Sequence, residues 1–339
     1  MNWAEALPVI FMALMGLSML AYVVLDGYDL GVGLLLHRAT DDQKDTMIAS
    51  IGPFWDANET WLVLGVGILL IAFPKAHGMV LQALYLPVAL MLVGLILRGV
   101  AFDFRVKAQA DHKPRWNLAF WFGSGLAAAS QGWMLGHYIT GLQSGWAYNV
   151  FAGVIALLLP AAYVLLGATW LIMKTEGELQ RHAVRWAKIA WLPVVVGMGL
   201  ISIATPWVSE TVREKWFAMP ALIALLPIPL MTLAALVGVR LTLNSKRVAV
   251  YPLPGSDGRL CWLPFVLVVA VFLLGAFGLA YSLFPYVVMD QLTIWESASA
   301  TGSLAIIAVG CAITVPTIAG YTIWSYRVFW GKASELRYA

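Results

Sequence analysis

Residues 50–61, with the sequence SIGPFWDANETW, place charged side chains at the start of a long apolar run. The run continues to Phe73 and is long enough to cross a bilayer. Its first half carries Asp56, Asn58 and Glu59. A charge inside a membrane helix costs about 2.5–3.5 kcal/mol even on a lenient scale, so such residues are rarely incidental. Asp56 and Glu59 share a helical face, which is therefore expected to contact protein or water rather than lipid.

The composition indicates a membrane protein. Of the 339 residues, 61% are hydrophobic and 12% are charged, whereas a soluble domain has about 25% charged residues. The net charge of +3 forms no basic stripe, which argues against a nucleic acid partner. Cys261 and Cys311 lie in apolar segments and are interpreted as buried small residues, not a disulfide. The N-terminus lacks the basic start of a cleaved signal peptide, so the first helix is expected to be retained.

Apolar runs of about 20 residues predict nine transmembrane helices. The fold class is therefore an all-α polytopic membrane protein without a soluble domain. The predicted spans are residues 8–36, 51–73, 78–104, 118–141, 147–173, 187–208, 217–242, 260–285 and 302–328. The longest predicted loops are residues 105–117, 174–186 and 243–259, and the last contains the Pro/Gly turn cluster YPLPGSDG.

The distribution of basic residues supports this count, because cytoplasmic loops carry an excess of lysine and arginine. Of the 21 lysines and arginines, 17 fall in one alternating set of loops and the C-terminal tail. The other set holds only Lys75, Arg213 and Lys215, and Arg98 lies inside the third span. Removing the second span would destroy the bias. We therefore expect a periplasmic N-terminus and a cytoplasmic C-terminus.

This orientation places six charged residues in the cytoplasmic half of the first three helices: Asp26, Asp29, Asp56, Glu59, Arg98 and Asp103. Five carboxylates around one arginine cannot all be ionised in a low-dielectric layer, so some are protonated or the site is wet. Either state suits proton uptake from the cytoplasm. The structural alternative is that Arg98 neutralises one or two acids and locks three helices together, while Asp29 and Asp103 reach headgroups. By position alone, Trp55 and Trp61 are interpreted as packing or interface residues.

The histidines argue against haem ligation by this chain. Four of them, His37, His77, His112 and His182, lie at helix ends or in loops, and His137 lies within a span near the outer surface. A chain that holds its own haems needs axial ligands at membrane depth. No metal-binding or haem-attachment motif is present either. We therefore predict no metal site and no catalytic residue in this chain alone.

With these residues in view, the chain resembles subunit II of cytochrome bd-type quinol oxidases, including the cyanide-insensitive branch. Three motifs in the right order carry the resemblance: LDGYDLGVG at residues 25–33, SIGPFWDANETWL at residues 50–62 and LRGVAFDFR at residues 97–105. The overall length and the nine-span layout also agree. The specificity lies in the first 105 residues, and the C-terminal half supports the resemblance only through hydropathy.

The resemblance implies two four-helix bundles plus a peripheral ninth helix in one integral membrane domain. The bundles would cover about residues 1–142 and 147–285, with the ninth helix at about 302–328. The partner would be a subunit I of the bacterial inner membrane that binds haem b with haem d or a second haem b, and oxidises quinol. Together they would reduce dioxygen to water with protons drawn from the cytoplasm. Some family members add a small single-helix accessory subunit or hold a structural quinone in subunit II.

The resemblance also implies roles for the charged residues. Asp56, Trp61 and Asp103 match the family's proposed proton route, and Glu59 lies beside them where many relatives have a neutral residue. Asp29 and Arg98 match positions that support the haem pair, and Asp26 joins them as their neighbour.

Two other classes of protein also fit intramembrane acids. A proton-coupled secondary transporter usually has Gly/Pro-broken helices near the midplane in both halves. In this sequence the acids concentrate in the first three predicted helices at one depth, which disfavours a transporter. The second alternative is a non-catalytic membrane scaffold.

Overall fold

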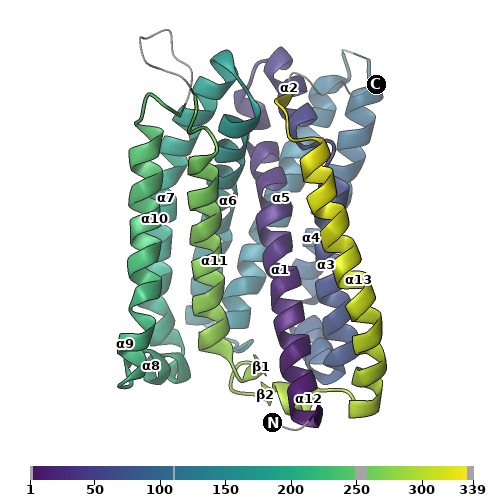
Figure 1. The fold of residues 1–339 in the computed structure, drawn as a ribbon, viewed down its shortest axis with the longest axis vertical. Helices are drawn as coiled ribbons and strands as arrows, with labels where there is room; N and C mark the ends of the chain where they lie inside the picture. Colours follow the sequence, from purple (N-terminus) through teal and green to yellow (C-terminus); the bar gives the residue numbers. More distant parts are fainter. Residues whose placement is uncertain (1–2, 110, 249–257, 334–339) are drawn as a thin grey trace.

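In the computed structural model, which describes residues 3–109, 111–248 and 258–333, the long helices run side by side along the longest axis (Figure 1). The helices are α1 (Trp3–Leu35), the 3₁₀ helix η1 (Leu36–Arg38), α2 (Asp41–Ile51), α3 (Trp55–Ala72), α4 (Pro74–Lys107), α5 (Lys113–Ile139), α6 (Trp146–Lys174), α7 (Gly177–Val208), α8 (Glu210–Phe217), α9 (Ala221–Leu225), α10 (Pro227–Leu243), α11 (Leu263–Leu283), α12 (Ile294–Ser297) and α13 (Thr301–Val328). A short antiparallel hairpin, β1 (Tyr286–Val288) and β2 (Leu292–Thr293), precedes α12.

The predicted all-α membrane fold is confirmed. Within the described ranges, eight helices are long and apolar enough to cross a membrane. The ninth long helix, α5, has 27 residues but carries the buried polar side chains of Asn117, Ser124 and Gln131. It tolerates them because it packs against α4, α6 and α1. Each of the nine predicted spans therefore corresponds to one long helix or, for residues 217–242, to α9 followed by α10.

Several predicted boundaries were wrong. The second span begins at Trp55, because Ser50 and Ile51 complete α2. Residues 177–186, predicted as loop, form the first turns of α7, because Leu179, Ala183 and Trp186 supply a buried apolar face. The predicted turn cluster at residues 251–258 lies outside the described residues except Gly258.

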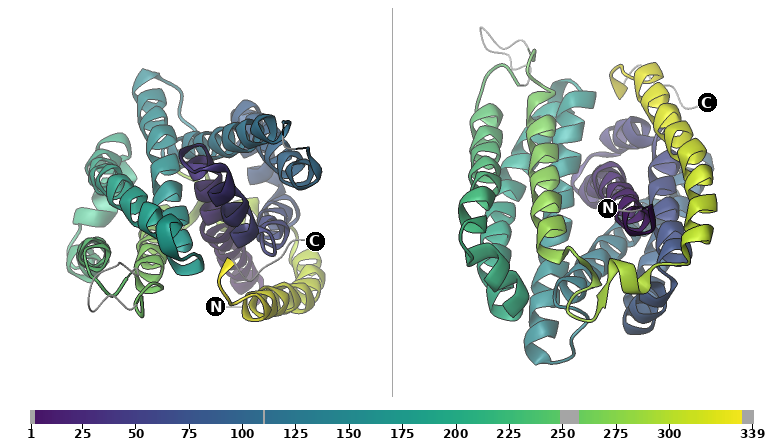
Figure 2. Two further views of the ribbon diagram at one scale, coloured as in Figure 1. Left: turned by 90° about the horizontal axis from the view of Figure 1, so that it is seen from above. Right: turned by 60° about the horizontal axis from the view of Figure 1, so that its bottom comes forward.

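The long helices pack around α1, α5 and α6, which contact one another. In addition, α1 contacts α3, α4 packs against α5, α7 packs against α6, and α10 packs against α11. Helix α13 lies at the edge against α1 and α3 (Figure 2). Two lysines fasten the end of α13: Lys174 donates to the carbonyls of Phe329, Trp330 and Gly331, and Lys332 donates to those of Met173 and Thr175.

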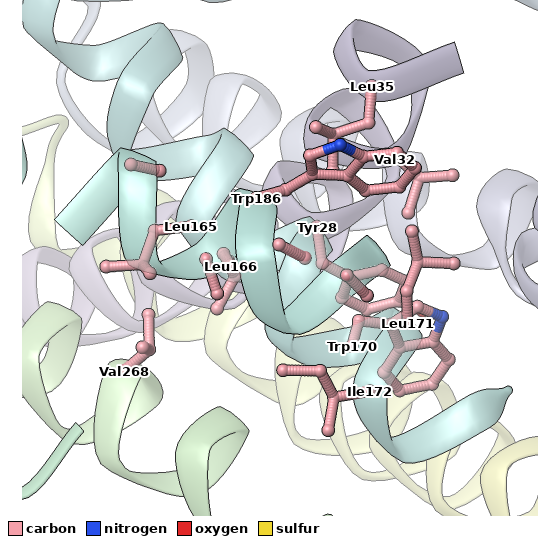
Figure 3. Close-up of a cluster of buried hydrophobic side chains, with 14 of the residues drawn as sticks. Tyr28, Val32, Leu35, Leu165, Leu166, Trp170, Leu171, Ile172, Trp186 and Val268 are labelled. Carbon is pink, nitrogen blue, oxygen red and sulfur yellow. The ribbon is translucent and has the colours of Figure 1, made fainter. Parts of the chain in front are cut away.

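The largest apolar core lies where α1 meets α6, α7 and α11 (Figure 3). Tyr28 of α1 stacks on Trp170 of α6 with ring centroids 4.2 Å apart. Both rings are fully buried, and Phe54 and Phe265 pack against Trp170. This core fixes the position of the stretch of α1 that carries Asp26 and Asp29.

Two glycines bring α4 against α5 next to Arg98. A Cβ atom added to Gly94 would lie 2.7 Å from the Gly123 carbonyl oxygen. A Cβ atom added to Gly123 would lie 2.9 Å from the backbone nitrogen of Arg98. Neither position tolerates a side chain, because real Cβ atoms do not approach backbone so closely. Small residues at helix crossings allow such contacts in membrane proteins. Gly94 and Gly123 therefore fix how closely α4 and α5 pack beside Arg98.

Candidate functional site: a buried charge cluster

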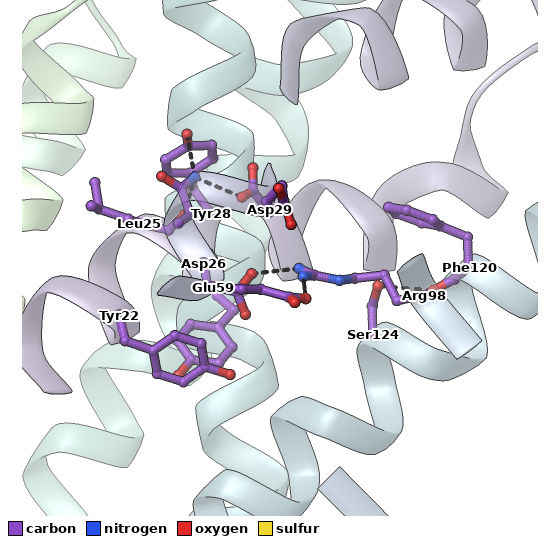
Figure 4. A network of polar contacts seen from close by, with 12 residues as sticks. Tyr22, Leu25, Asp26, Tyr28, Asp29, Glu59, Arg98, Phe120 and Ser124 are labelled. Carbon is purple, nitrogen blue, oxygen red and sulfur yellow. Dashed lines mark hydrogen bonds and ion pairs between the residues drawn. The ribbon is translucent and has the colours of Figure 1, made fainter. Parts of the chain in front are cut away.

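The centre of the candidate site is Arg98, which is only 1% exposed. Its Nη1 donates to Oδ1 of Asp26 at 2.5 Å, and its Nη2 pairs with Glu59 (Figure 4). Asp26 is fully buried, whereas the Glu59 side chain is 28% exposed. The Arg98 guanidinium also lies 5.9 Å from the centroid of the Trp55 ring. One cation therefore ties together α1, α3 and α4.

A second branch of the cluster is built around Asn58, which is fully buried on α3. Its Nδ2 donates to Oδ2 of Asp29 and to the Tyr28 hydroxyl, both at 2.8 Å. Its Oδ1 accepts from the Tyr326 hydroxyl at 3.2 Å, and the two tyrosine hydroxyls bond to each other. Tyr326 stacks on Phe54 with centroids 4.5 Å apart. This branch connects Asp29 to the outer helix α13.

A third polar group lies on α1 one turn before Asp26. Gln131 of α5 donates to the Tyr22 hydroxyl at 2.7 Å and accepts from the Tyr163 hydroxyl at 2.6 Å. All three side chains are at least 90% buried. Residues four apart on a helix are neighbours, so Tyr22 lies beside Asp26. Polar side chains from α1, α5 and α6 thus continue the cluster deeper into the bundle.

Three buried atoms of the cluster lack a hydrogen-bond partner among the described residues: Oδ2 of Asp26, Oδ1 of Asp29 and Nε of Arg98. Buried polar atoms in proteins are nearly always paired with protein or ordered water. The cluster is therefore suited to hold water or protons, because acids in a low-dielectric layer cannot all be ionised.

The other predicted residues lie differently. Asp56 and Asp103 are exposed on α3 and α4 and form no ion pair with a described residue. Of Asp56 and Glu59, only Glu59 pairs with Arg98, and Asp56 lies outside the charge cluster. Trp61 is 6% exposed and its Nε1 has no partner among the described residues. Asp26 and Glu59 alone contact the arginine, not all five carboxylates.

Sequence reasoning missed several members of the site. Tyr28 lies within the LDGYDLGVG motif beside Asp29, and Gln131 is a polar residue within a predicted span, so both carried a signal. The sequence around Tyr326 contained no signal of its role, because that role depends on where α13 packs. Arg105 was counted as a loop cation, yet it is 3% exposed in α4 and bonds Asp45 of α2 at 2.7 Å and Asn117 at 2.5 Å.

Comparison with known proteins decides the family. The family model described as cytochrome bd terminal oxidase subunit II matches residues 7–329. This chain belongs to the cytochrome bd terminal oxidase subunit II family.

Relatives of this subunit II chain span its whole length. The cytochrome bd-I ubiquinol oxidase subunit 2 of Escherichia coli K12 is 27% identical, with 98% of this chain and 96% of the relative covered. The cytochrome bd ubiquinol oxidase subunit 2 of Bacillus subtilis 168 is also 27% identical, with 95% of each covered. The bd oxidase structure from Geobacillus thermodenitrificans contains a chain with the same fold at a TM-score of 0.76 and 17% identity, covering 96% of this chain and 100% of that one.

The family membership confirms the resemblance and gives the function: this is subunit II of a bd-type terminal oxidase, and a transporter is not favoured. Cytochrome oxidases work with haem and with a partner subunit I. The five histidines of subunit II lie in η1, in the first or last turns of α4, α5 and α7, or at the cap of α5, and none joins the charge cluster. The charge cluster therefore contains no imidazole that could ligate a haem iron.

Proposed function

We propose that this subunit pairs with a haem-bearing subunit I in the bacterial inner membrane and conducts protons to the dioxygen-reducing site that its partner holds. The complex would oxidise quinol and reduce dioxygen to water, with haem b and haem d or a second haem b in subunit I. No bond-making step falls to subunit II alone. The buried Arg98 cluster with Asp26 and Glu59 carries this proposal, because buried charges at membrane depth mark ion pathways, proton relays or ligand counter-ions.

The proposed proton route begins at the exposed acids. Asp56 lies in the first turn of α3, and Trp55 beside it contacts Phe102 of α4 with ring centroids 5.2 Å apart. The first turn of α3 thus lies against the stretch of α4 that carries Arg98 and Asp103. An exposed carboxylate at membrane depth is costly in lipid, which supports a partner subunit or water on this face. Trp61 lies two turns into α3, at the inner end of the proposed route.

The cluster around Arg98 would have a different role. Asp26 and Asp29 lie on α1, and hydrogen bonds from Arg98 of α4 and Asn58 of α3 fix their positions. Fixed charges stabilise charge changes in a low-dielectric site without reorganisation. We infer that they support the haem pair, while Glu59 links them to the exposed Asp56. A structural quinone and a small accessory subunit remain predictions.

The proposed orientation has the N-terminus in the periplasm and the C-terminus in the cytoplasm, with the chain forming one membrane domain. The 17-to-3 bias of basic residues supports it. A reporter that is active only in the cytoplasm, fused after Ala339, is expected to be active. The matched control is a reporter that is active only in the periplasm at the same position. Activity of that second fusion would contradict the nine-span topology.

Copurification tests the proposed assembly. Subunit II with an affinity tag, solubilised in mild detergent, is expected to carry a second large membrane subunit, haem absorbance and quinol-dependent oxygen consumption. Recovery of a stable, folded subunit II without haem or a second large subunit would contradict the proposal.

His137 tests whether subunit II contributes a haem ligand. It is partly buried in the last turn of α5, with its ring 5.2 Å from that of Trp133. Replacing His137 with alanine is expected to leave the haem content of the purified complex unchanged. Pyridine haemochrome spectra per mole of complex measure this, with His182→Ala at the other end of the bundle as the control. Loss of a single haem in an otherwise assembled His137→Ala complex would show that the chain supplies a ligand.

A further inference from the structure

A groove of about 600 Å³ lies between α1 and α13. It is near the C-terminal end of α13, at the same end of the molecule as α2 (Figure 1). Leu25 of α1 forms one wall. The other wall is formed by the last turns of α13 and by a residue two positions beyond its end: Thr322, Ile323, Tyr326, Arg327 and Trp330. Ile323 is 69% exposed and Trp330 is 71% exposed, so the groove opens on the outside of the helix bundle. An apolar groove on this surface faces the lipid.

Thr322 gives the groove a polar contact point. Its side chain is 91% buried, and its hydroxyl has no partner among the described residues. Two other threonines of α13 donate to the carbonyl four residues earlier, Thr314 at 3.0 Å and Thr317 at 2.7 Å. A buried hydroxyl without a partner is unfavourable, so the Thr322 hydroxyl is suited to a group that enters the groove.

Arg327 gives the groove a positive end. Its guanidinium is exposed and pairs with no carboxylate among the residues described. Arginine binds phosphate oxygens bidentately, and tryptophans such as Trp330 favour the boundary between lipid and water. Arg327 and Thr322 are five residues apart, which is about 7.5 Å along a helix. Both residues line the groove, so one elongated ligand with a charged head and a polar neck can contact both.

We propose that this groove binds one phospholipid, with its phosphate on Arg327, an ester carbonyl accepting from Thr322 and an acyl chain along Leu25 and Ile323. Free phosphate would leave the apolar walls uncovered, so the lipid is the occupant that fits both ends of the groove. The bound lipid would cover Tyr326, whose hydroxyl bonds Asn58, which in turn bonds Asp29. The lipid therefore closes the α13 side of the charge cluster.

Phospholipid retention tests this site in the purified oxidase complex. Arg327→Gln and Thr322→Val are each expected to lose one tightly bound phospholipid per complex, measured as organic phosphorus and by native mass spectrometry. After delipidation, phosphatidylglycerol vesicles should restore it to the unmodified complex with about tenfold higher affinity than to Arg327→Gln, the effect of one charge-assisted contact.

The matched controls are Arg38→Gln, an exposed arginine of η1, and Thr314→Val, whose hydroxyl bonds within its own helix. Both are expected to retain the lipid. Equal phospholipid content in all four variants would overturn the site. A variant that loses quinone in place of phospholipid, or a site filled by inorganic phosphate alone, would also overturn it. Because lipid retention is measured without turnover, these outcomes are independent of the proposed proton route.

Discussion

Replacing Arg98 with leucine is expected to prevent assembly of the oxidase complex or to lower its haem content sharply. The substitution leaves the fully buried Asp26 without its cation and releases Glu59. Breaking a buried ion pair from one side costs about 3–5 kcal/mol, because an uncompensated charge remains. That is a large share of the roughly 5–15 kcal/mol that stabilises a typical protein. Haem absorbance and subunit II content in detergent-solubilised membranes measure the effect.

Two further variants separate charge from shape. Arg98→Lys keeps the positive charge but loses the fork that reaches both acids, so a milder loss of haem is expected. The double variant Arg98→Leu with Asp26→Asn removes the orphaned charge, and part of the assembly should return. Full haem occupancy with leucine alone would show that Arg98 is not needed to hold α1, α3 and α4 together.

Replacing Asp56 with asparagine is expected to leave assembly and haem content normal but to slow quinol-dependent oxygen consumption by about tenfold or more. A positioned proton-transfer group raises a reaction rate by about 10²–10⁴-fold, and water replaces such a group only in part. Asp56 is exposed and makes no ion pair with a described residue, so the change removes no folding contact. Asparagine keeps the shape and the hydrogen bonding of the side chain but cannot carry a proton.

Matched variants locate the effect. Asp103→Asn is expected to be weaker, because Asp103 lies in the last turns of α4 and makes no ion pair with a described residue, whereas Asp56 is one turn from Glu59, which pairs with Arg98. Asp42→Asn, an exposed acid in the first turn of α2, serves as the control and should not slow turnover. A normal rate for Asp56→Asn would place the proton route outside this subunit and leave the acids with a structural role.

Most of the fold could be predicted from the sequence, because a helix that crosses a bilayer needs a long apolar run. Apolar length and the bias of basic residues predicted a helix for each span, and local patterns predicted Asp26, Glu59 and Arg98 at one depth. Helix ends were less predictable, since the first turns of α7 are charged on one face while Leu179 and Ala183 are buried on the other.

The contacts of the cluster could not be predicted from spacing alone. Which acids meet Arg98 depends on how three helices rotate against one another, and Asp56 turned outward while Glu59 turned inward. Tyr326 joins from about 270 residues later in the chain because α13 returns to α1, a packing choice that hydropathy does not encode. Arg105 looked like a loop cation because its partners Asp45 and Asn117 lie on other helices.

Proton uptake during turnover shows whether protons pass through subunit II. The complex would be reconstituted into vesicles with a pH indicator on the side of its α2 end, and a pulse of dioxygen given to the quinol-reduced enzyme. If the route passes through Asp56, the unmodified complex and Asp42→Asn take up protons rapidly from that side. Asp56→Asn takes them up much more slowly, in step with its slower oxygen consumption. Unchanged proton uptake by Asp56→Asn, or uptake from the opposite side, would contradict this route.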